Sequence, residues 1–337
     1  MNHHPAPGFA TEIAHPLLPR RVFIYDRSLM RAIPSLSTVL SDNTSGAQAI
    51  TRTVTRLLLR LCARQRGSTP VELKAAVLKL AGRVLQAHPA MVSLVHLFNR
   101  LLISLDREAK QITAELKKFE RGLDRHNQEI ASAAARLIKN DGVVMTHSAS
   151  QTVKDALFRR WAGGKRFRVV CTESRPAREG ALLARALARR GIPTVLITDA
   201  LEFSMIEGGL ERNGKPDLIL VGADAISAQG VINKAGTLGL ALAARAWSVP
   251  FYVLAGSEKF APRGYPLGQV IRDKPASEIL TVLPKRLRVI NRYFDITPLE
   301  YVTAIVSEHG VLRPERMRKT LSGIRIHPKL MRIIESL

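Results

Sequence analysis

The sequence predicts an α/β protein, with a helical N-terminal domain followed by a domain built on a parallel sheet with helices on both faces. Two observations lead to this fold class. From about residue 20 to residue 140, apolar residues recur at intervals of three and four, the spacing of amphipathic helices. From Asp141 and Gly142 onward, short apolar runs alternate with helical stretches, as in strands joined by crossover helices. The domain boundary is therefore expected near residue 140.

The N-terminal half begins with an irregular segment, 1–20, where His and Pro recur and a flexible tail is expected. The helical domain, 21–140, shows helical spacing at 51–64, 71–87, 91–105 and 106–139. Thr69 followed by Pro70 is a typical helix start. The last pattern has one apolar stripe, formed by Ile112, Leu116, Phe119, Leu123, Ile130, Ala134 and Leu137. A helix of about 30 residues could link two lobes or pack along a partner subunit.

The second domain, 141–312, contains six short apolar runs that are candidate strands: 143–146, 167–172, 194–198, 218–221, 251–255 and 287–290. Helical stretches are expected at 150–162, 178–190 and 238–247. The remaining residues, 313–337, are a basic tail with a weak amphipathic pattern, suited to docking on the body of the protein or on a neighbour.

Composition narrows the class of protein. The chain has 337 residues, 46% hydrophobic and 23% charged, as in a soluble globular protein. No apolar run is long enough to span a membrane, and the first residues lack a secretory signal pattern. Two cysteines, Cys62 and Cys171, form neither a disulfide framework nor a metal cluster, and Cys171 is expected to be an inert strand residue. We therefore expect a cytoplasmic protein without a metal, a cofactor or a membrane partner.

The net charge of +23 leaves two interpretations open. One is a solvated basic surface that has no specific partner. The other is an anionic partner, such as RNA or a phosphorylated ligand. Aromatic residues make up only 5% of the chain, so the stacking platforms used by single-strand binders are scarce.

The stretch 217–237 carries the strongest functional signal. Its apolar run, 218–221, reads as a strand buried on both faces, and Asp224 stands at the carboxyl end of that strand. Ligands bind at this edge of open α/β sheets. Asn233 and Lys234 follow, and Thr237 is a candidate N-cap of a helix whose first amides could hold an anion. Together these groups predict a pocket for a phosphorylated small molecule, with Asp224 as an acid or base.

Other polar residues at strand ends have structural alternatives. Ser148 and Gln151 match a capping box. Arg175 could hold a phosphate or pair with Glu173 or Glu179, and Asp199 could cap a helix near Leu201. Lys234 and Lys259 are candidate phosphate ligands or surface lysines. His147 adjoins Ser148, but adjacent residues rarely act as nucleophile and base, and no nucleophile elbow is present, which argues against a hydrolase.

Several motifs between Ser41 and Val311 resemble one known family. They read SDNTSGA, DGVVMTHSAS, TESRPAREG, VGADAI, NKAGT, PFYVLAGSEKF and FDITPLEYVTAIVSEHGV. In this order they resemble the family that joins the regulatory subunits of the eukaryotic translation factor eIF2B with ribose-1,5-bisphosphate isomerase and methylthioribose-1-phosphate isomerase. The resemblance implies a helical N-terminal domain, a Rossmann-like second domain, and a homodimer or larger homo-oligomer.

The resemblance also implies site residues. The isomerases of the family use a cysteine and an aspartate, which fall on Ser148 and Asp224. The substrate-binding positions fall on Ser45, Gly46, Ala47, His88, Ser150, Asn233, Lys234 and Lys259, and Arg175 joins them as a phosphate ligand. Three of these positions depart from the isomerases: serine replaces the cysteine, Ser45 opens the R-G-A loop, and His88 replaces an arginine.

Three functional hypotheses follow. The first is an aldose–ketose isomerase acting on a phosphorylated ribose, with Asp224 as acid or base and Ser148 as a weakened counterpart. The second is a non-catalytic regulatory subunit that senses a sugar phosphate or nucleotide and binds a partner protein. The third is RNA binding by the basic surface.

Overall fold

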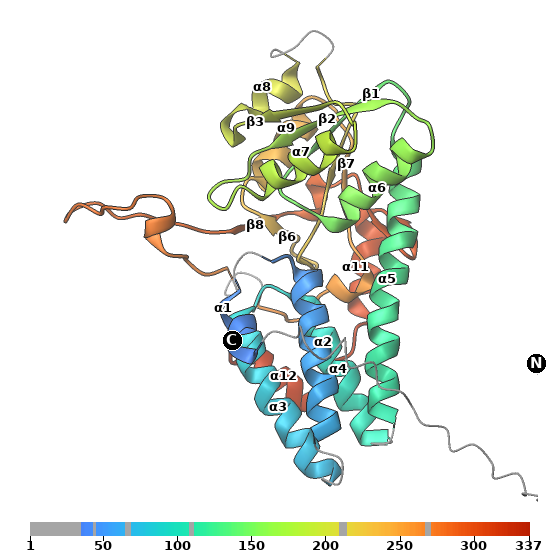
Figure 1. Ribbon diagram of the computed structural model, residues 1–337, viewed down its shortest axis with the longest axis vertical. Coiled ribbons are helices and arrows are strands. Elements are labelled where there is room, and N and C mark those ends of the chain that lie inside the picture. The colour runs from blue at the N-terminus through green and yellow to red at the C-terminus, as the bar shows by residue number, and fades with distance from the viewer. Residues whose placement is uncertain (1–34, 43–44, 65–68, 108–110, 209–213, 267–270) are drawn as a thin grey trace, which may run out of the picture. The chain divides into compact units, whose positions relative to one another are not determined.

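The computed structural model describes residues 35–42, 45–64, 69–107, 111–208, 214–266 and 271–337 (Figure 1). The expected flexible tail, 1–20, lies outside these residues, as do Asn43 and Thr44 of the SDNTSGA motif. Within the described ranges, no helix combines the length and apolarity needed to cross a bilayer.

Five helices precede the first strand in the described part of the chain. They are α1 (Leu36–Ser41), α2 (Ala47–Arg64), α3 (Pro70–Ala87), α4 (Val92–Arg107) and α5 (Ile112–Leu137). The expected start of α3 is confirmed: the Thr69 side chain accepts from the Glu72 amide, the Glu72 carboxylate accepts from the Thr69 amide, and Pro70 occupies the first turn. This reciprocal pair satisfies donors that the helix itself cannot pair.

Helix α5 is 26 residues long and buries its apolar stripe, including Leu116, Phe119, Leu123 and Ile130. Its first half contacts α2 and α4, and its last turns contact α6 (Gln151–Ala162), as Figure 1 shows. The prediction of one helix over 106–139 is therefore confirmed for 112–137, whereas residues up to Arg107 belong to α4.

The central sheet has seven strands in the order β10-β9-β7-β4-β1-β2-β3. All neighbouring pairs are parallel except β9 with β10. The strands are β1 (Gly142–Thr146), β2 (Phe167–Thr172), β3 (Thr194–Ile197), β4 (Leu218–Val221), β7 (Phe251–Leu254), β9 (Ala304–Ser307) and β10 (Gly310–Leu312). Five of these coincide with predicted strands to within one residue at each end, which confirms the parallel α/β class.

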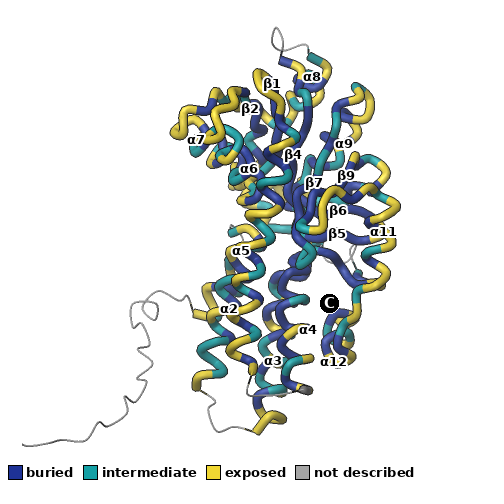
Figure 2. The backbone as a smooth tube through the Cα atoms, turned by 90° about the vertical axis from the view of Figure 1, so that its right-hand side faces the viewer, coloured by how far each residue is buried: buried dark blue, intermediate teal, exposed yellow. Residues whose placement is uncertain are grey.

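Alternate residues of the strands enter two apolar clusters on opposite faces. On one face Met145 and Val221 pack with α8 (Glu202–Glu207), α9 (Thr237–Ala246) and α11 (Pro314–Ser322). On the other face Val144 and Leu220 pack with α5, α6 and α7 (Glu179–Arg189). Figure 2 shows β4 as a continuous buried segment, whereas Tyr252 of β7 is partly buried. Burial on both faces explains why the strands are uninterrupted apolar runs.

A second, antiparallel sheet was not expected from the sequence. It contains β5 (Ala225–Ile226), β6 (Val231–Lys234) and β8 (Phe294–Thr297). The predicted strand at 287–290 is wrong: these residues form no strand, and Leu287 and Ile290 are 45% and 57% exposed. They belong to a segment that projects from the strands in Figure 1 (orange).

The C-terminal residues, expected as a basic tail, form α11 and α12 (Pro328–Glu335). Leu330 and Ile334 of α12 are buried in the same apolar cluster as α2, α3 and α4, so the end of the chain packs on the helical half. The basic residues of these helices are mostly exposed, whereas the buried positions are apolar.

Candidate active site

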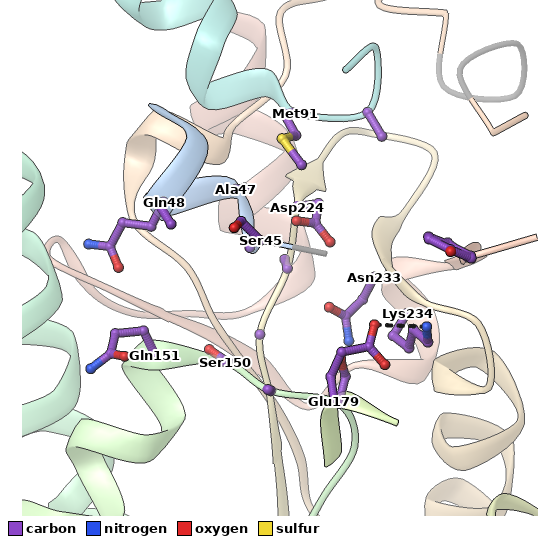
Figure 3. A pocket seen from close by; sticks show the side chains of 18 of the residues that line it. Ser45, Ala47, Gln48, Met91, Ser150, Gln151, Glu179, Asp224, Asn233 and Lys234 are labelled. Carbon is purple, nitrogen blue, oxygen red and sulfur yellow. Dashed lines mark hydrogen bonds and ion pairs between the residues drawn. The ribbon is translucent and has the colours of Figure 1, made fainter. Parts of the chain in front are cut away.

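A cavity of about 930 Å³ lies at the carboxyl ends of the parallel strands. The chain runs from β1 to β2 and β3 on one side and returns to β4 on the other, so the strand order reverses between β1 and β4. Such a switch point opens a crevice where the two loops diverge. Here the loop after β1 carries Ser148 and Ser150, and the loop after β4 carries Asp224. Figure 3 shows side chains from the helical half and from both sheets converging on this space.

Ten of the eleven sequence-predicted site residues line this cavity. They are Ser45, Gly46, Ala47, His88, Ser148, Ser150, Asp224, Asn233, Lys234 and Lys259. Arg175 does not line it. That side chain is exposed, while its backbone amide and that of Ser174 donate to the Asp199 carboxylate at 2.7 Å each. Asp199 therefore holds the loop after β2, instead of capping the helix near Leu201.

The close approach of the β1 and β4 loops depends on Gly222. A Cβ at this position would lie 2.8 Å from the Cβ and the Oγ of Ser150. Ser150 is itself the N-cap of α6, and its hydroxyl accepts from the Val153 amide. The expected capping box with Ser148 as cap is therefore wrong by two residues. Ser148 instead has a left-handed backbone (φ 64°), and its amide donates to Ser174 Oγ at 2.8 Å.

Asp224 is a partly buried acid whose backbone amide donates to the Ile232 carbonyl. Burial raises the pKa of its carboxyl group, and the negative charge of Glu179 acts in the same direction. The ammonium groups of Lys259 and Lys234 oppose this rise in pKa. Asp224 and the two lysines thus line the same cavity, while their roles as acid and phosphate ligands stay predictions.

Lys234 is almost fully buried, at 3% exposure, on strand β6. Its Nζ forms an ion pair with Glu179 Oε1 at 2.9 Å and lies 4.7 Å from the centre of the Tyr293 ring. Its neighbour Asn233 donates from Nδ2 to Thr237 Oγ1 at 3.0 Å. A buried ammonium needs such partners, because removal from water otherwise favours its neutral form.

Lys259 is placed by a short helical turn, Ser257–Lys259, that is tied to two other elements. His126 of α5 lies 3.3 Å from Glu258 and 3.4 Å from Glu308, and the Ser257 amide donates to Glu308. The hydrogen bond to Glu258 is the main cause that raises the pKa of His126. These contacts hold the turn in place and therefore fix the position of the Lys259 backbone.

The start of α9 is occupied by a carboxylate of the protein itself. Asp295 Oδ2 accepts from the amides of Gly236 (2.8 Å) and Leu238 (3.1 Å). Gly236 is the N-cap, and Thr237 Oγ1 donates back to the Lys234 carbonyl. The predicted Thr237 cap is therefore wrong, and the amides expected to hold a ligand anion are already paired with Asp295.

His147 is not a general base for Ser148. Burial lowers the pKa of its imidazole, so the ring is neutral. Its Nε2 donates to the Ala235 carbonyl at 2.9 Å, which leaves Nδ1 to accept from the Thr172 hydroxyl at 2.6 Å. Both ring nitrogens are thus engaged, in agreement with the expectation that no hydrolase pair exists here.

His88 is buried and its pKa is lowered by burial. Its Nε2 donates to the Val39 carbonyl at 2.7 Å, so this position of the cavity wall carries an imidazole that is already engaged. Other cations line this end of the cavity, namely Arg272 and Lys274. The Arg272 guanidinium donates to the carbonyls of Gln86 and Leu337.

Sequence reasoning missed Glu179, Arg272, Lys274 and Tyr293 as cavity residues. Glu179 lies within the TESRPAREG motif and could have been found there, but it was considered only as a partner of Arg175. The other three follow or precede the projecting segment, where no motif marks them. Cys171 was assigned correctly: it is fully buried, and burial raises the pKa of its thiol to about 12.

Comparison with known proteins decides the family. The model of the Initiation factor 2 subunit family matches residues 43–314. The chain belongs to this family. Its members here include a Pyrococcus furiosus protein named "Putative translation initiation factor eIF-2B subunit 2-like", 36% identical over 246 residues, covering 72% of this chain and 83% of that relative.

Two further family members bear on fold and function. A ribose 1,5-bisphosphate isomerase of Archaeoglobus fulgidus is 32% identical over 244 residues, covering 70% of this chain and 75% of that protein. The crystal structure of the Pyrococcus horikoshii translation initiation factor eIF-2B superposes with a TM-score of 0.72 at 31% identity, covering 87% of this chain and 99% of the other. The family thus contains relatives named as isomerases and relatives named as initiation factor subunits.

Proposed function

We propose that this family member is an aldose–ketose isomerase acting on a phosphorylated ribose of the ribose 1,5-bisphosphate or methylthioribose 1-phosphate type. The observation that carries the proposal is the cavity, because it gathers Asp224, Asn233, Lys234 and Lys259 at one switch point of the sheet. An acid, an amide and two ammonium groups match a sugar with hydroxyl and phosphate groups.

Phosphate would be held at the helical side of the cavity. Ser45, Gly46 and Ala47 lie at the start of α2, which has 18 residues and no acidic residue in its first turn. The Ser45 amide already donates to Asp42 Oδ1 at 2.9 Å, so an anion here would be held by the amides that follow at the start of α2. Lys259 supplies a positive charge on the cavity wall.

Asp224 would act as the acid that opens the sugar ring. The raised pKa of its carboxyl group keeps a proton available closer to neutral pH than in an ordinary aspartic acid. Ser148 would hydrogen-bond the substrate from the other loop, because a hydroxyl ionises far less readily than the thiol of the isomerases.

A second candidate function rests on that serine and on the relative named as an initiation factor subunit. In this alternative the protein is a non-catalytic regulatory subunit that binds a sugar phosphate or nucleotide and a partner protein. It predicts that ligand raises the melting temperature without turnover.

The deciding experiment incubates the purified protein with ribose 1,5-bisphosphate and, separately, methylthioribose 1-phosphate, and measures the ketose product. We expect turnover that falls about 100-fold or more in Asp224→Asn, because the acid is lost. Ser148→Cys should raise turnover, since a thiolate is accessible near neutral pH. Product formation no greater than in Asp224→Asn, together with ligand-induced stabilisation, would favour the regulatory subunit.

A further inference from the structure

Glu179 lies on the cavity wall and has one carboxylate oxygen without a hydrogen-bond partner in the part of the chain that the structure describes. It is the first residue of α7, and its Oε1 is paired with Lys234 Nζ at 2.9 Å (Figure 3). Its Oε2 is buried and has no hydrogen-bond partner among the described residues. Buried carboxylate oxygens normally accept hydrogen bonds, so this atom is suited to a donor that a ligand brings.

Within the described part of the chain, seven buried side-chain atoms lack a partner, and two of their residues line the cavity: Glu179 and Asn127. The Asn127 amide already donates to Asp155 Oδ2, and its remaining oxygen belongs to a neutral amide that cannot take up a proton. Glu179 therefore offers the only unpartnered carboxylate oxygen of this set on the cavity wall.

Two of the carboxyl groups that line the cavity, Glu179 and Asp224, have different surroundings. Glu179 Oε1 is paired with the buried ammonium group of Lys234, while its Oε2 has no hydrogen-bond partner among the described residues. Burial is the largest influence on the pKa of the Asp224 carboxyl group and raises it. The negative charge of Glu179 raises this pKa further. A carboxylate oxygen open to a donor and a carboxyl group that keeps its proton to higher pH than usual can serve as base and acid.

We propose that Glu179 is the catalytic base of the isomerisation and accepts the proton of the substrate's C2 hydroxyl. This role rests on the proposed function. The other polar groups nearby are engaged or unsuited: both ring nitrogens of His147 are bonded, and the Ser150 hydroxyl caps α6. Ser148 has a hydroxyl, whose conjugate base is not populated at neutral pH.

The step balances without an external reagent. The C1–O4 bond of the ring breaks, its electron pair stays on O4, and Asp224 gives O4 a proton. The hydrogen on C2 moves to C1 with its electron pair, so C1 is reduced and C2 is oxidised. The C2 hydroxyl becomes a carbonyl as its proton passes to Glu179 Oε2. Both carboxyl groups then return to their starting protonation states through solvent.

The test compares wild type with Glu179→Gln, Glu179→Asp and the matched control Glu173→Gln. Glu173 lies on the same loop, is not part of the cavity wall, and pairs with Arg178 at 3.8 Å. Steady-state kinetics are measured with ribose 1,5-bisphosphate from pH 5 to 9. Folding and substrate binding are checked for each variant by melting temperature with and without that substrate.

Glu179→Gln should lower kcat about 100-fold or more while KM changes less than about tenfold, because binding is kept and proton acceptance is lost. Glu179→Asp, which keeps a carboxylate, should recover part of the activity, and Glu173→Gln should match wild type.

Two results would overturn the assignment. If wild type turns over and Glu179→Gln keeps kcat within about threefold, Glu179 is not the base, although the isomerase function stands. If wild type binds the substrate but forms no ketose, the isomerase function fails, and the catalytic role of Glu179 fails with it.

Discussion

Glu202 lies beside α9 with one buried carboxylate oxygen that has no partner among the described residues. Burial raises the pKa of its carboxyl to about 8, and the charges of Asp199 and Asp295 add to this rise. The folded protein therefore holds a proton on Glu202 at neutral pH. Asp295, which caps α9, has its pKa raised to about 6, again mainly by burial.

The raised pKa of Glu202 predicts how the stability of the fold depends on pH. A carboxyl group whose folded pKa exceeds its unfolded value of about 4.5 stabilises the fold fully below that value, and the contribution is lost as pH rises through about 8. Glu202→Gln cannot ionise, so its free energy of unfolding should fall by about 2–4 kcal/mol less than that of wild type between pH 5 and pH 9.

Urea unfolding at several pH values measures this difference. Glu207→Gln, an exposed position on the same helix, is the control and should follow the wild-type curve within about 0.5 kcal/mol. Parallel curves for Glu202→Gln and wild type would show that the carboxyl group is not held protonated by the fold.

At the scale of elements, the site depends on how closely the loops after β1 and β4 approach each other. Gly222→Ala would bring a Cβ to 2.8 Å from Ser150, at the start of α6. Since Ser150 caps that helix, we expect a loss of about 1–3 kcal/mol in the free energy of unfolding and a loss of ligand binding.

Gly82 offers the opposite case, because it lies inside α3 and an added Cβ would meet nothing within 4 Å. Gly82→Ala should therefore stabilise the protein by about 0.5–1 kcal/mol and leave ligand binding unchanged. Thermal and urea unfolding measure both variants. Equal stabilities for the two alanine variants would contradict the close approach at Gly222.

At the scale of the whole molecule, the candidate site does not account for the net charge of +23. Basic residues are dispersed over the chain, including many exposed positions on α11 and α12. Homo-oligomerisation and RNA binding remain predictions, and each concerns surfaces away from the strand ends.

A dispersed basic surface should give weak RNA binding that is mainly electrostatic. We expect affinity for a single-stranded RNA to fall about 100-fold or more between 50 and 200 mM salt, as counterion release requires when several phosphates are contacted. Fluorescence anisotropy across this range measures it. Tight binding that persists at 200 mM salt would instead indicate a dedicated RNA site.

The sequence by itself determined the fold class, and ten of the eleven residues that it proposed for the site line the cavity. Buried strands such as 167–172 and 218–221 need apolar side chains on both faces, and that requirement leaves a local signal. The same apolar signal gave a wrong strand prediction at 287–290, because apolar composition alone does not distinguish a buried strand from an exposed segment. The site motifs placed Asp224, Asn233 and Lys234 correctly on the cavity wall.

Only the tertiary structure decided how these groups are paired. Glu179 pairs with Lys234, which lies 55 residues further along the sequence. Asp295 accepts from the amide of Gly236, 59 residues earlier, at the start of α9. Neither partner follows from local spacing, because strand order and the depth of burial bring them together. The unpartnered oxygen of Glu179, the neutral state of His147 and the exposed position of Arg175 all result from this packing. Local periodicity encodes elements, whereas charge pairing in a cavity depends on contacts between elements far apart in the chain.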